Sequence, residues 1–531
     1  MPEVSRKRRV VVLGISCMSL FMIGLDDTTV SIALPTIAKS LNASVSGLQW
    51  IADGYTMVLA SLLIFGGATG DRFGRRKVFR IGLAAFTVGS ALCSLAPSLG
   101  WLIAFRVMQA VGGSMLNPLA VSIISSVYGN RTQRARAISV WVGMFGIGMA
   151  LGPVVGGVLV GTVGWRGIFW VNVPVGICAI VLSSLFVPES RGPVSRRPDW
   201  TAQVLVIAIL AALVYAIIEG AYTDWRATAI RSLFIVAVAM SAVLVVWELR
   251  RKDPLINLRY FRSLSFTAAV AIAVCAFADL GAFLFLTSIY LQVVQGFAVI
   301  PAGLHMLPTA AAMAICPSLA AWVTAKTGSA RLPLLFGGLM LMLSTILMSR
   351  FTGTSPNAHL LETFGLFGIG MGMVNSQISV AAVAGMPTSQ AGLASGIASA
   401  SRQVGQALGV AVAGSLLTEK AHGRVRAEFI LASHSVWHLL FWSSCVALLG
   451  GLVSRRAPAR HAKTGEFPRL GPLPGRPEQQ DSRSSARSAP PQEPVWPPER
   501  ESVWVPRYLA RLDSPDDSGP RPTLPGDTAG W

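Results

Sequence analysis

The sequence predicts an all-α membrane protein in which about fourteen transmembrane helices cross the bilayer. The 531-residue chain is 53% hydrophobic and only 13% charged, which is too apolar for a soluble core. Apolar runs of about 20 residues recur along most of the chain, and each could cross roughly 30 Å of hydrocarbon as a helix. The sequence contains no series of short alternating segments of the kind that builds a membrane β-barrel.

Each predicted span is a separate apolar run, and the first differs from a signal peptide. It is longer than the apolar region of a signal peptide and contains Asp26 and Asp27, so we expect it to remain as a helix. The fourteen predicted spans cover residues 10–34, 48–69, 78–96, 99–124, 137–160, 166–187, 200–221, 228–248, 265–290, 300–322, 332–350, 359–385, 391–417 and 433–453.

The basic residues predict how the spans are oriented. Arg and Lys gather after spans 2, 4, 6, 8, 10 and 14, whereas the alternate loops contain few, except the loop after span 13. Because basic loops stay in the cytoplasm, this pattern predicts that both termini are cytoplasmic. The same loops account for the formal net charge of +19, so we expect no nucleic-acid partner.

A weak internal repeat predicts two similar bundles. Gly70-Asp71-Arg72-Phe73-Gly74 follows span 2, and Ala325-Lys326-Thr327-Gly328 follows span 10 without the acid. If spans 9–14 repeat spans 1–6, spans 7 and 8 are an insert, and two bundles around a midplane site suit alternating access. The predicted parts are a cytoplasmic N-terminus at 1–9, an N-terminal six-helix bundle at 10–188, two inserted helices at 199–250, a C-terminal six-helix bundle at 263–454, and a disordered cytoplasmic tail at 455–531.

Charged side chains deep inside the predicted spans are the candidate functional residues, because an ionised group there costs about 2.5–3.5 kcal/mol. They are Asp26, Asp27, Asp53, Arg106, Asp279 and Arg402. Counted along the helices, Asp26, Asp53 and Arg106 fall in the same half of the first bundle. We expect these three to share one polar pocket in which Arg106 pairs with an acid, and Asp279 to belong to a weaker counterpart in the second bundle.

A carboxylate in such a pocket can bind and release a proton as its access to water changes. For each of these residues, the alternative is a static hydrogen bond or ion pair between helices. A second candidate feature is the run of small residues in span 5, at Gly148, Gly152, Pro153, Gly156 and Gly157. Glycines at every fourth position let another helix approach closely, and the proline permits a bend, although generic packing explains the same spacing.

Together these residues resemble the major facilitator superfamily, specifically its fourteen-helix drug:proton antiporter branch. Gly67-Ala68-Thr69-Gly70-Asp71-Arg72-Phe73-Gly74-Arg75-Arg76 is similar to the family's loop between spans 2 and 3, and Leu25–Pro35 to the branch's first span, which places its acid at Asp26. Arg106-Val107-Met108-Gln109-Ala110-Val111-Gly112 resembles the span 4 motif, with Ala110 in place of the usual glycine. Trp165–Asn172 and Tyr290–Gly296 also resemble this branch.

This resemblance covers about residues 10–454 and implies the major facilitator fold, in a multi-pass protein of the bacterial cytoplasmic membrane. It implies that Arg106 takes part in proton transfer, and that the span 5 glycines belong to an antiporter motif. The loop residues Gly67, Asp71, Arg72, Gly74, Arg75 and Arg76 are implied to gate the conformational change. The function implied is proton-coupled export of hydrophobic or cationic drugs, with protons, small molecules and membrane lipid as the partners.

Other functions fit the sequence less well. A dedicated exporter of one endogenous metabolite or antibiotic is the alternative that stays open. An ion-pumping subunit would use lysines inside its spans, and the predicted spans contain none. The sequence has no metal-ligand cluster, nucleophile elbow or phosphate loop, so we expect no enzyme activity, no metal and no cofactor, the proton gradient being the driving force. A nutrient symporter remains a minor alternative, and the oligomeric state stays open, a monomer being compatible with the sequence.

Overall fold

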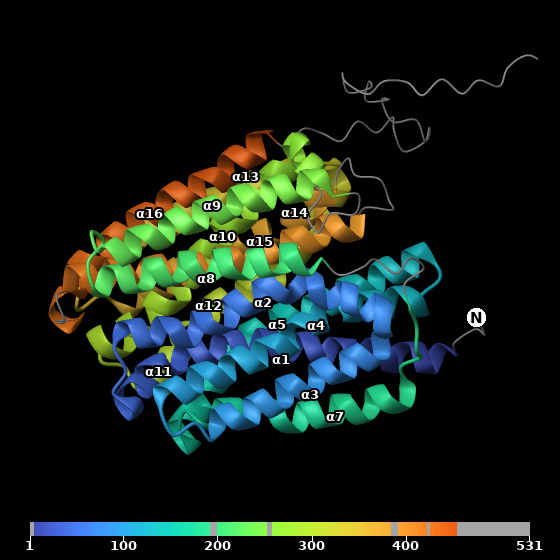
Figure 1. Ribbon diagram of the computed structural model, residues 1–531. Coiled ribbons are helices and arrows are strands. Elements are labelled where there is room, and N and C mark those ends of the chain that lie inside the picture. The colour runs from blue at the N-terminus through green and yellow to red at the C-terminus, as the bar shows by residue number, and fades with distance from the viewer. Residues whose placement is uncertain (1–4, 192–198, 252–257, 384–390, 422–424, 454–531) are drawn as a thin grey trace, which may run out of the picture. The chain divides into compact units, whose positions relative to one another are not determined.

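The computed structural model describes residues 5–191, 199–251, 258–383, 391–421 and 425–453, and the regular structure in these ranges is helical. The predicted tail at 455–531 lies outside the described residues. The helices are α1 Arg6–Leu41, α2 Val45–Phe73, α3 Arg75–Ser94, α4 Leu99–Val127, α5 Arg131–Val163, α6 Gly167–Trp170, α7 Asn172–Phe186, α8 Trp200–Tyr222, α9 Thr228–Arg250, the 3₁₀ turn η1 Leu258–Arg262, α10 Leu264–Ile289, the π-helical turn η2 Tyr290–Val294, α11 Val299–His305, α12 Leu307–Thr327, α13 Arg331–Met348, α14 Asn357–Val383, α15 Ala391–Ala421 and α16 Val425–Val453 (Figure 1).

The predicted spans and the observed helices agree in number and position. Thirteen of the described helical segments are long and apolar enough to cross a membrane. The fourteenth predicted span is α15, which is long enough but contains Arg402, Gln403 and Gln406 near its middle. The helix α15 packs on α2, α8, α10 and α16, which accounts for polar side chains at its middle. With the thirteen apolar segments, the described part of this multi-pass membrane protein therefore has fourteen long helical segments.

Local sequence signals fix where several helices begin and end. Ser44 accepts a hydrogen bond from the backbone of Gly47 and so caps the start of α2. The short turn from α2 to α3 needs Gly74, whose φ of 109° is a conformation that favours glycine. The side chain of Asp199 caps α8 by accepting from the backbone N–H of Ala202 at 3.1 Å.

The first and last six spans have the same packing pattern. In the first set α1 packs on α5, α2 on α4, and α3 on both α4 and α7. In the last set α10 packs on α15, α12 on α14, and α13 on both α14 and α16. These pairs match when spans 9–14 are aligned with spans 1–6, so the fold is two similar six-helix sets joined by the inserted pair α8 and α9.

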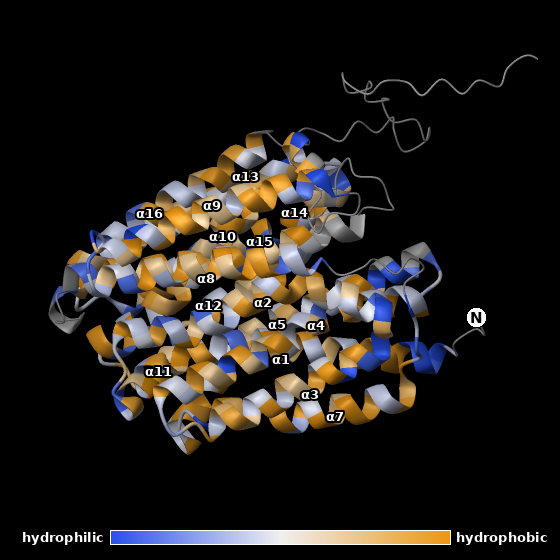
Figure 2. Ribbon diagram, in the orientation of Figure 1, coloured by the Kyte–Doolittle hydropathy of each residue, from blue (hydrophilic) through white to orange (hydrophobic). Residues whose placement is uncertain are grey.

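Apolar residues predominate along the helices (Figure 2), and many large ones are exposed, as expected for a surface in contact with lipid. The clearest case is α9, where Ile235 and Val238 are about seven-tenths exposed, at 68% and 71%. The hydrophilic residues gather at the helix ends and at a few places along the helices (Figure 2).

The two ends of the bundle differ in how the six-helix sets contact each other. We call the end where α1 begins the proximal end, and the end where α1 finishes and α2 begins the distal end. Gln292 donates to the carbonyl of Ile32 near the distal end, and a Cβ on Gly157 would lie 3.1 Å from the Val299 carbonyl. The hydrogen bonds recorded between the sets lie at mid-depth or toward the distal end, so this conformation is closed distally.

Candidate functional site

A buried ion pair lies at the centre of the first six-helix set. Asp26 of α1 and Arg106 of α4 are 1% and 2% exposed, and Arg106 Nη1 lies 2.5 Å from Asp26 Oδ2. Arg106 also donates to Gln109 Oε1 at 2.7 Å and to the Ile51 carbonyl at 3.3 Å. Its guanidinium carbon lies 4.1 Å from the centre of the Tyr55 ring. Arg106 is therefore held from α1, α2 and α4 together.

The carboxylate of Asp26 is equally well satisfied. Its Oδ1 accepts from Gln109 Nε2 and from Asn172 Nδ2, both at 2.9 Å. Gln109 donates in turn to the hydroxyl of Ser90 on α3. Donors from α4 and α7 thus satisfy both oxygens of this carboxylate, and a buried ion pair with such partners is tolerated because its charges are compensated.

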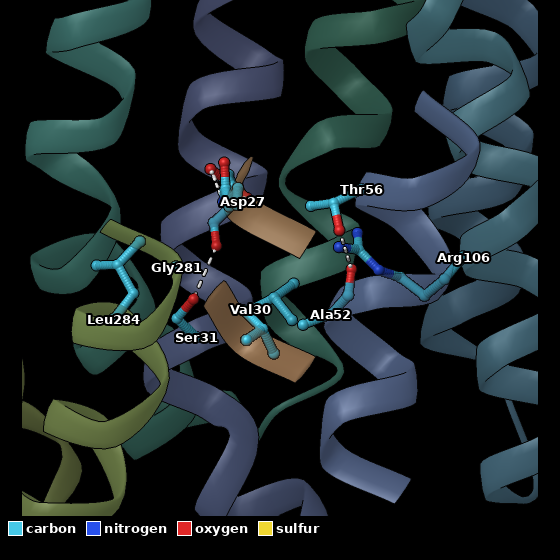
Figure 3. A pocket seen from close by; sticks show the side chains of 10 residues that line it. Asp27, Val30, Ser31, Ala52, Thr56, Arg106, Gly281 and Leu284 are labelled. Atoms are coloured by element: carbon cyan, nitrogen blue, oxygen red, sulfur yellow. Dashed lines mark hydrogen bonds between the residues drawn. The ribbon is translucent and has the colours of Figure 1, made fainter. Parts of the chain in front are cut away.

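The next residue along α1, Asp27, faces a cavity between the two six-helix sets. Figure 3 shows Asp27 and Ser31 on one side of this cavity and Thr56 with Arg106 on the other. Both oxygens of Asp27 accept from Gln406 Nε2 of α15, at 2.8 and 2.9 Å. The other lining residues are Val30, Ala52, Gly281, Leu284, Gln406 and Val410.

The charges around this cavity do not cancel. Among the residues that the structure describes, Arg106 is the one cation that lines it, and Arg106 is already paired with Asp26. Asp27 has a neutral amide as its partner and is partly exposed to the cavity, whereas Asp26 is buried. An ionised Asp27 would therefore give the cavity a net charge of about −1, which either a proton or a bound cation would neutralise.

Asp53 lies apart from this group, although the sequence suggested one shared pocket. It is fully buried but does not line the cavity, and its single recorded hydrogen bond is a 3.5 Å contact from Thr56 Oγ1. The reason is helix geometry, because Ala52 and Thr56 line the cavity while Asp53 is turned about 100° away along α2.

The candidate charges of the last six spans also lie outside the cavity lining. Asp279 of α10 is fully buried and accepts from two hydroxyls of α16, those of Ser443 and Ser444. Arg402 of α15 donates to the hydroxyls of Ser379 and Ser399, and no ion pair to it is recorded among the described residues. Hydroxyl partners on neighbouring helices thus take the place of the expected second pocket.

The small residues of α5 form the surface on which α1 packs. A Cβ on Gly148 would lie 2.5 Å from the Phe21 carbonyl, and one on Gly152 would overlap the Thr28 hydroxyl. Gly156 has Ile32 and Thr29 at similarly short distances. Gly157 faces the other way, toward α11 of the last set, and Pro153 contacts Gly303 of the same helix. The run thus contacts both sets at once.

The residues expected to form the gating loop lie at the end of α2, at the Gly74 turn and at the start of α3, and their recorded contacts are within the first set. Asp71 pairs with Arg75 at 2.9 Å, and Arg75 also donates to the Ser122 carbonyl of α4. Glu189, just after α7, accepts from the backbone N–H groups of Arg76 and Lys77. Gly67 packs on Pro118, and a Cβ on Gly74 would meet Glu189, while Arg72 lies against Phe73.

A sequence profile described as Major Facilitator Superfamily matches residues 16–410, which is most of the chain. The chain belongs to the Major Facilitator Superfamily. The match includes both sides of the cavity, since it covers Asp27 of α1 as well as Gln406 of α15.

Curated relatives in this superfamily are similar along about 70% of the chain. "Multidrug resistance protein Stp" of Mycobacterium tuberculosis is 36% identical over 372 residues, covering 70% of this chain and 68% of its own. "Tetracenomycin C resistance and export protein" of Streptomyces glaucescens is 33% identical, covering 69% and 70%. "Multidrug efflux pump LfrA" of Mycolicibacterium smegmatis is 31% identical, covering 71% and 74%.

Solved structures show the same fold. A bacterial homologue of the human lysosomal transporter Spinster, in an inward-facing and unoccupied conformation, aligns with a TM-score of 0.61 at 17% identity, covering 86% of this chain and 100% of that one. A POT family transporter in complex with 5-aminolevulinic acid aligns with a TM-score of 0.59 at 15% identity, covering 85% and 97%.

Three residues of the site did not stand out in the sequence as charged candidates. Gln109 and Asn172, which bind Asp26, are neutral, and only their place in the superfamily motifs drew attention to them. Gln406 had no signal at all, because a single amide in a long helix is common. A search for amides as well as charges inside the spans would have found all three.

Proposed function

We propose that this superfamily member is a proton-coupled antiporter that exports hydrophobic or cationic compounds across the bacterial cytoplasmic membrane by alternating access. The observation that supports this most is the cavity carboxylate of Asp27, which forms no ion pair with any described residue. A positively charged compound or a proton would each neutralise it. Because the two would compete for one carboxylate, binding one favours the release of the other, which is the requirement for antiport.

In this proposal both termini are cytoplasmic, so the distal end faces outward and the conformation described here is closed on its outer side. The cavity is small in this conformation, so the two sets must first move apart around it. The substrate then enters from the cytoplasm or the inner leaflet and displaces the proton from Asp27. Apolar lining residues such as Val30 and Leu284 would contact its hydrophobic part. After the sets rock, a proton from outside displaces the substrate.

The buried pair has a different part in this mechanism. Asp26, Gln109 and Asn172 hold Arg106 at the cavity wall, where its positive charge lies opposite Asp27. We propose that this fixed charge keeps Asp27 able to lose its proton at neutral pH. The names of the relatives are consistent with such a pump, since they include two multidrug proteins.

A dedicated exporter of one compound is the second candidate. Two relatives whose names refer to one antibiotic each support it. They are the tetracenomycin C resistance and export protein and a methylenomycin A resistance protein of Bacillus subtilis, which is 32% identical. A panel of chemically diverse compounds in a cell without other pumps would distinguish the two. Resistance to one chemotype alone would favour the dedicated exporter.

The test is transport by purified protein in proteoliposomes with an imposed proton gradient. We expect a lipophilic cation to move against the proton flow, and the movement to stop when a protonophore collapses the gradient. Transport that continued unchanged without the gradient would contradict proton coupling, and accumulation in the direction of proton flow would indicate a symporter instead.

A further inference from the structure

The distal ends of α2 and α15 meet along a polar contact that is separate from the cavity. We call this contact the distal seam and define it by Gln49 and Asp53 of α2 and by Ala411 and Gly414 of α15. Gln49 is fully buried, and its Nε2 donates to the Ala411 carbonyl at 2.7 Å. A Cβ on Gly414 would overlap the Gln49 side chain, so the absence of a side chain there makes room for this contact.

The contact with Ala411 fixes which way the Gln49 amide points. A backbone carbonyl can only accept, so the atom facing Ala411 must be the amide nitrogen. The amide oxygen, Oε1, then points elsewhere, and it is buried with no hydrogen-bond partner among the described residues. A buried acceptor without a donor costs roughly 1–3 kcal/mol.

A second unpartnered acceptor lies one helical turn away. Asp53 is 0% exposed, and its Oδ2 also has no hydrogen-bond partner in the described chain. Side chains four residues apart on a helix are neighbours, and Gln and Asp at this spacing form hydrogen bonds. The spacing of four residues places both acceptors on one face of α2, where one hydrogen between them would satisfy both.

No described charge takes the place of that hydrogen. From α4, Arg106 is engaged by Asp26, Gln109 and the Ile51 carbonyl. From α8, Glu219 is bonded to Ser46 and Trp50, and the Tyr215 ring packs on Trp50. From α15, the residues from Gln403 to Thr418 include no titratable group.

The remaining charges near α2 also have other partners. Asp26 and Asp27 of α1 are bonded to Arg106 and Gln406, and Arg402 lies further toward the proximal end, at Ser379 and Ser399. On α2 itself, the Tyr55 ring lies against Arg106. A lone ionised carboxylate would be costly in this place, and a neutral carboxylic acid would not.

We propose that Asp53 is a second proton-binding site, whose proton joins Asp53 Oδ2 to Gln49 Oε1 and thereby locks the distal seam. In the locked form Gln49 donates to α15 and accepts from Asp53, so all three groups are satisfied. When α2 and α15 separate, water reaches both side chains and Asp53 can release its proton. Closure of the distal end therefore takes up one proton that the cavity carboxylate does not bind.

This inference goes beyond the proposed antiport, because it concerns a different carboxylate and predicts a pH effect without substrate. Thr56 lies between the two sites, since it lines the cavity and donates to Asp53. The two carboxylates are thus neighbours with separate partners, and they can be altered one at a time.

The test measures the distance between the distal ends of the two sets as a function of pH. Gly100 lies in the first turn of α4 and Gly353 in the turn between α13 and α14, and a side chain at either glycine would meet nothing within 4 Å. Nitroxide labels are attached to the cysteines of a Gly100→Cys, Gly353→Cys variant in which the six native cysteines are replaced. Double electron–electron resonance spectroscopy in nanodiscs then reports the distance between the two labels. The closed-to-open ratio should rise as pH falls, by up to about tenfold per pH unit for one linked proton.

Asp53→Asn should abolish that pH dependence and stay closed throughout, because its amide donates to Gln49 Oε1 as the protonated acid does. Gly414→Ala, which disturbs Gln49 instead, should shift the protein toward the open form at low pH. Glu219→Gln is the matched control, since it neutralises an acid of α8 on the same side of α2, and it should keep the wild-type pH dependence.

Asp27→Asn separates this proposal from the proposed function. It should lose cation transport yet keep the pH-dependent distance. If Asp53→Asn retained the wild-type pH dependence, or if the wild-type distance did not respond to pH, the distal proton site would be wrong even where Asp27 proved to be the exchange site.

Discussion

Asp26 and Asp27 are adjacent in the sequence but have different chemical surroundings. Asp26 faces α4 and is bonded to Arg106, Gln109 and Asn172, whereas Asp27 faces the cavity with Gln406 as its partner. Successive residues on a helix point about 100° apart, so a pair of acids is divided between a buried ion pair and an accessible site. The sequence drew attention to both, and the family resemblance placed the acid of the first span at Asp26, whereas the geometry supports Asp27 for exchange.

We predict that Asp26→Asn abolishes proton-coupled efflux while the protein remains inserted. The substitution leaves Arg106 as a buried charge without its counter-ion, and breaking a buried pair in this way typically costs about 3–5 kcal/mol. Inverted-vesicle transport and thermal unfolding of the purified protein measure the two effects. Asp224→Asn, at an exposed turn after α8, is the control and should resemble the wild type in both assays. Efflux at the wild-type rate in Asp26→Asn would remove this residue from the mechanism.

At the scale of the elements, the sequence predicted that a helix would pack closely on the glycines of α5, but it did not identify that helix. The spacing of Gly148, Gly152 and Gly156 predicted that a helix would approach, but not that α1 would be that helix. Nothing in the spacing gave the second contact either, in which Gly157 meets α11.

We predict that Gly152→Leu stops the transport cycle because the new side chain would overlap Thr28 on α1. The matched control is Gly143→Leu, on the opposite face of α5, where a side chain meets nothing within 4 Å. Transport assays on equal amounts of inserted protein should show loss in the first variant and near-normal rates in the second. Equal cycling in both would show that α1 and α5 do not need their close approach.

The hairpin of α8 and α9 is held at its proximal end by Asp199. This carboxylate caps α8 and accepts from Trp247 Nε1 and from Arg251 Nε, each at 3.1 Å. Burial alone would raise the pKa of Asp199, but these hydrogen bonds and the Arg251 charge bring the pKa below its ordinary value. The ionised form therefore contributes stability above about pH 4, where an unfolded Asp is also ionised, and this contribution is lost as the pH falls through the lowered pKa.

We predict that Asp199→Asn lowers the free energy of unfolding by about 1 kcal/mol at neutral pH. The amide can still cap α8 but loses the charge in the bonds to Trp247 and Arg251, and a hydrogen bond to a charged group is stronger than a neutral one by about that amount. The difference from the wild type should shrink as the pH falls below about 4, since the wild-type carboxylate is then protonated. Thermal unfolding in detergent at several pH values measures both. A difference that stayed constant down to pH 2 would contradict an ionic contribution from Asp199.

For the whole molecule, the sequence predicted the fold much better than the site. Fourteen apolar runs were enough to place every span, because hydrophobic length is a local property of the chain. The partners of each charge depend on which helices meet, and those contacts join residues such as Asp27 and Gln406 that are nearly 400 positions apart. Asp53 shows the limit most clearly, because equal depth along the chain did not mean the same cavity.

The central claim is that a proton and a substrate cation compete for Asp27 in the cavity between the two sets. It is tested most directly by the affinity of the purified protein for a lipophilic cation between pH 5 and pH 9. We expect the wild-type affinity to fall toward low pH by up to about tenfold per unit, as the proton displaces the cation, and Asp27→Asn to bind weakly with no such dependence. An Asp27→Asn protein that bound the cation as tightly as the wild type, with the same pH dependence, would contradict the claim.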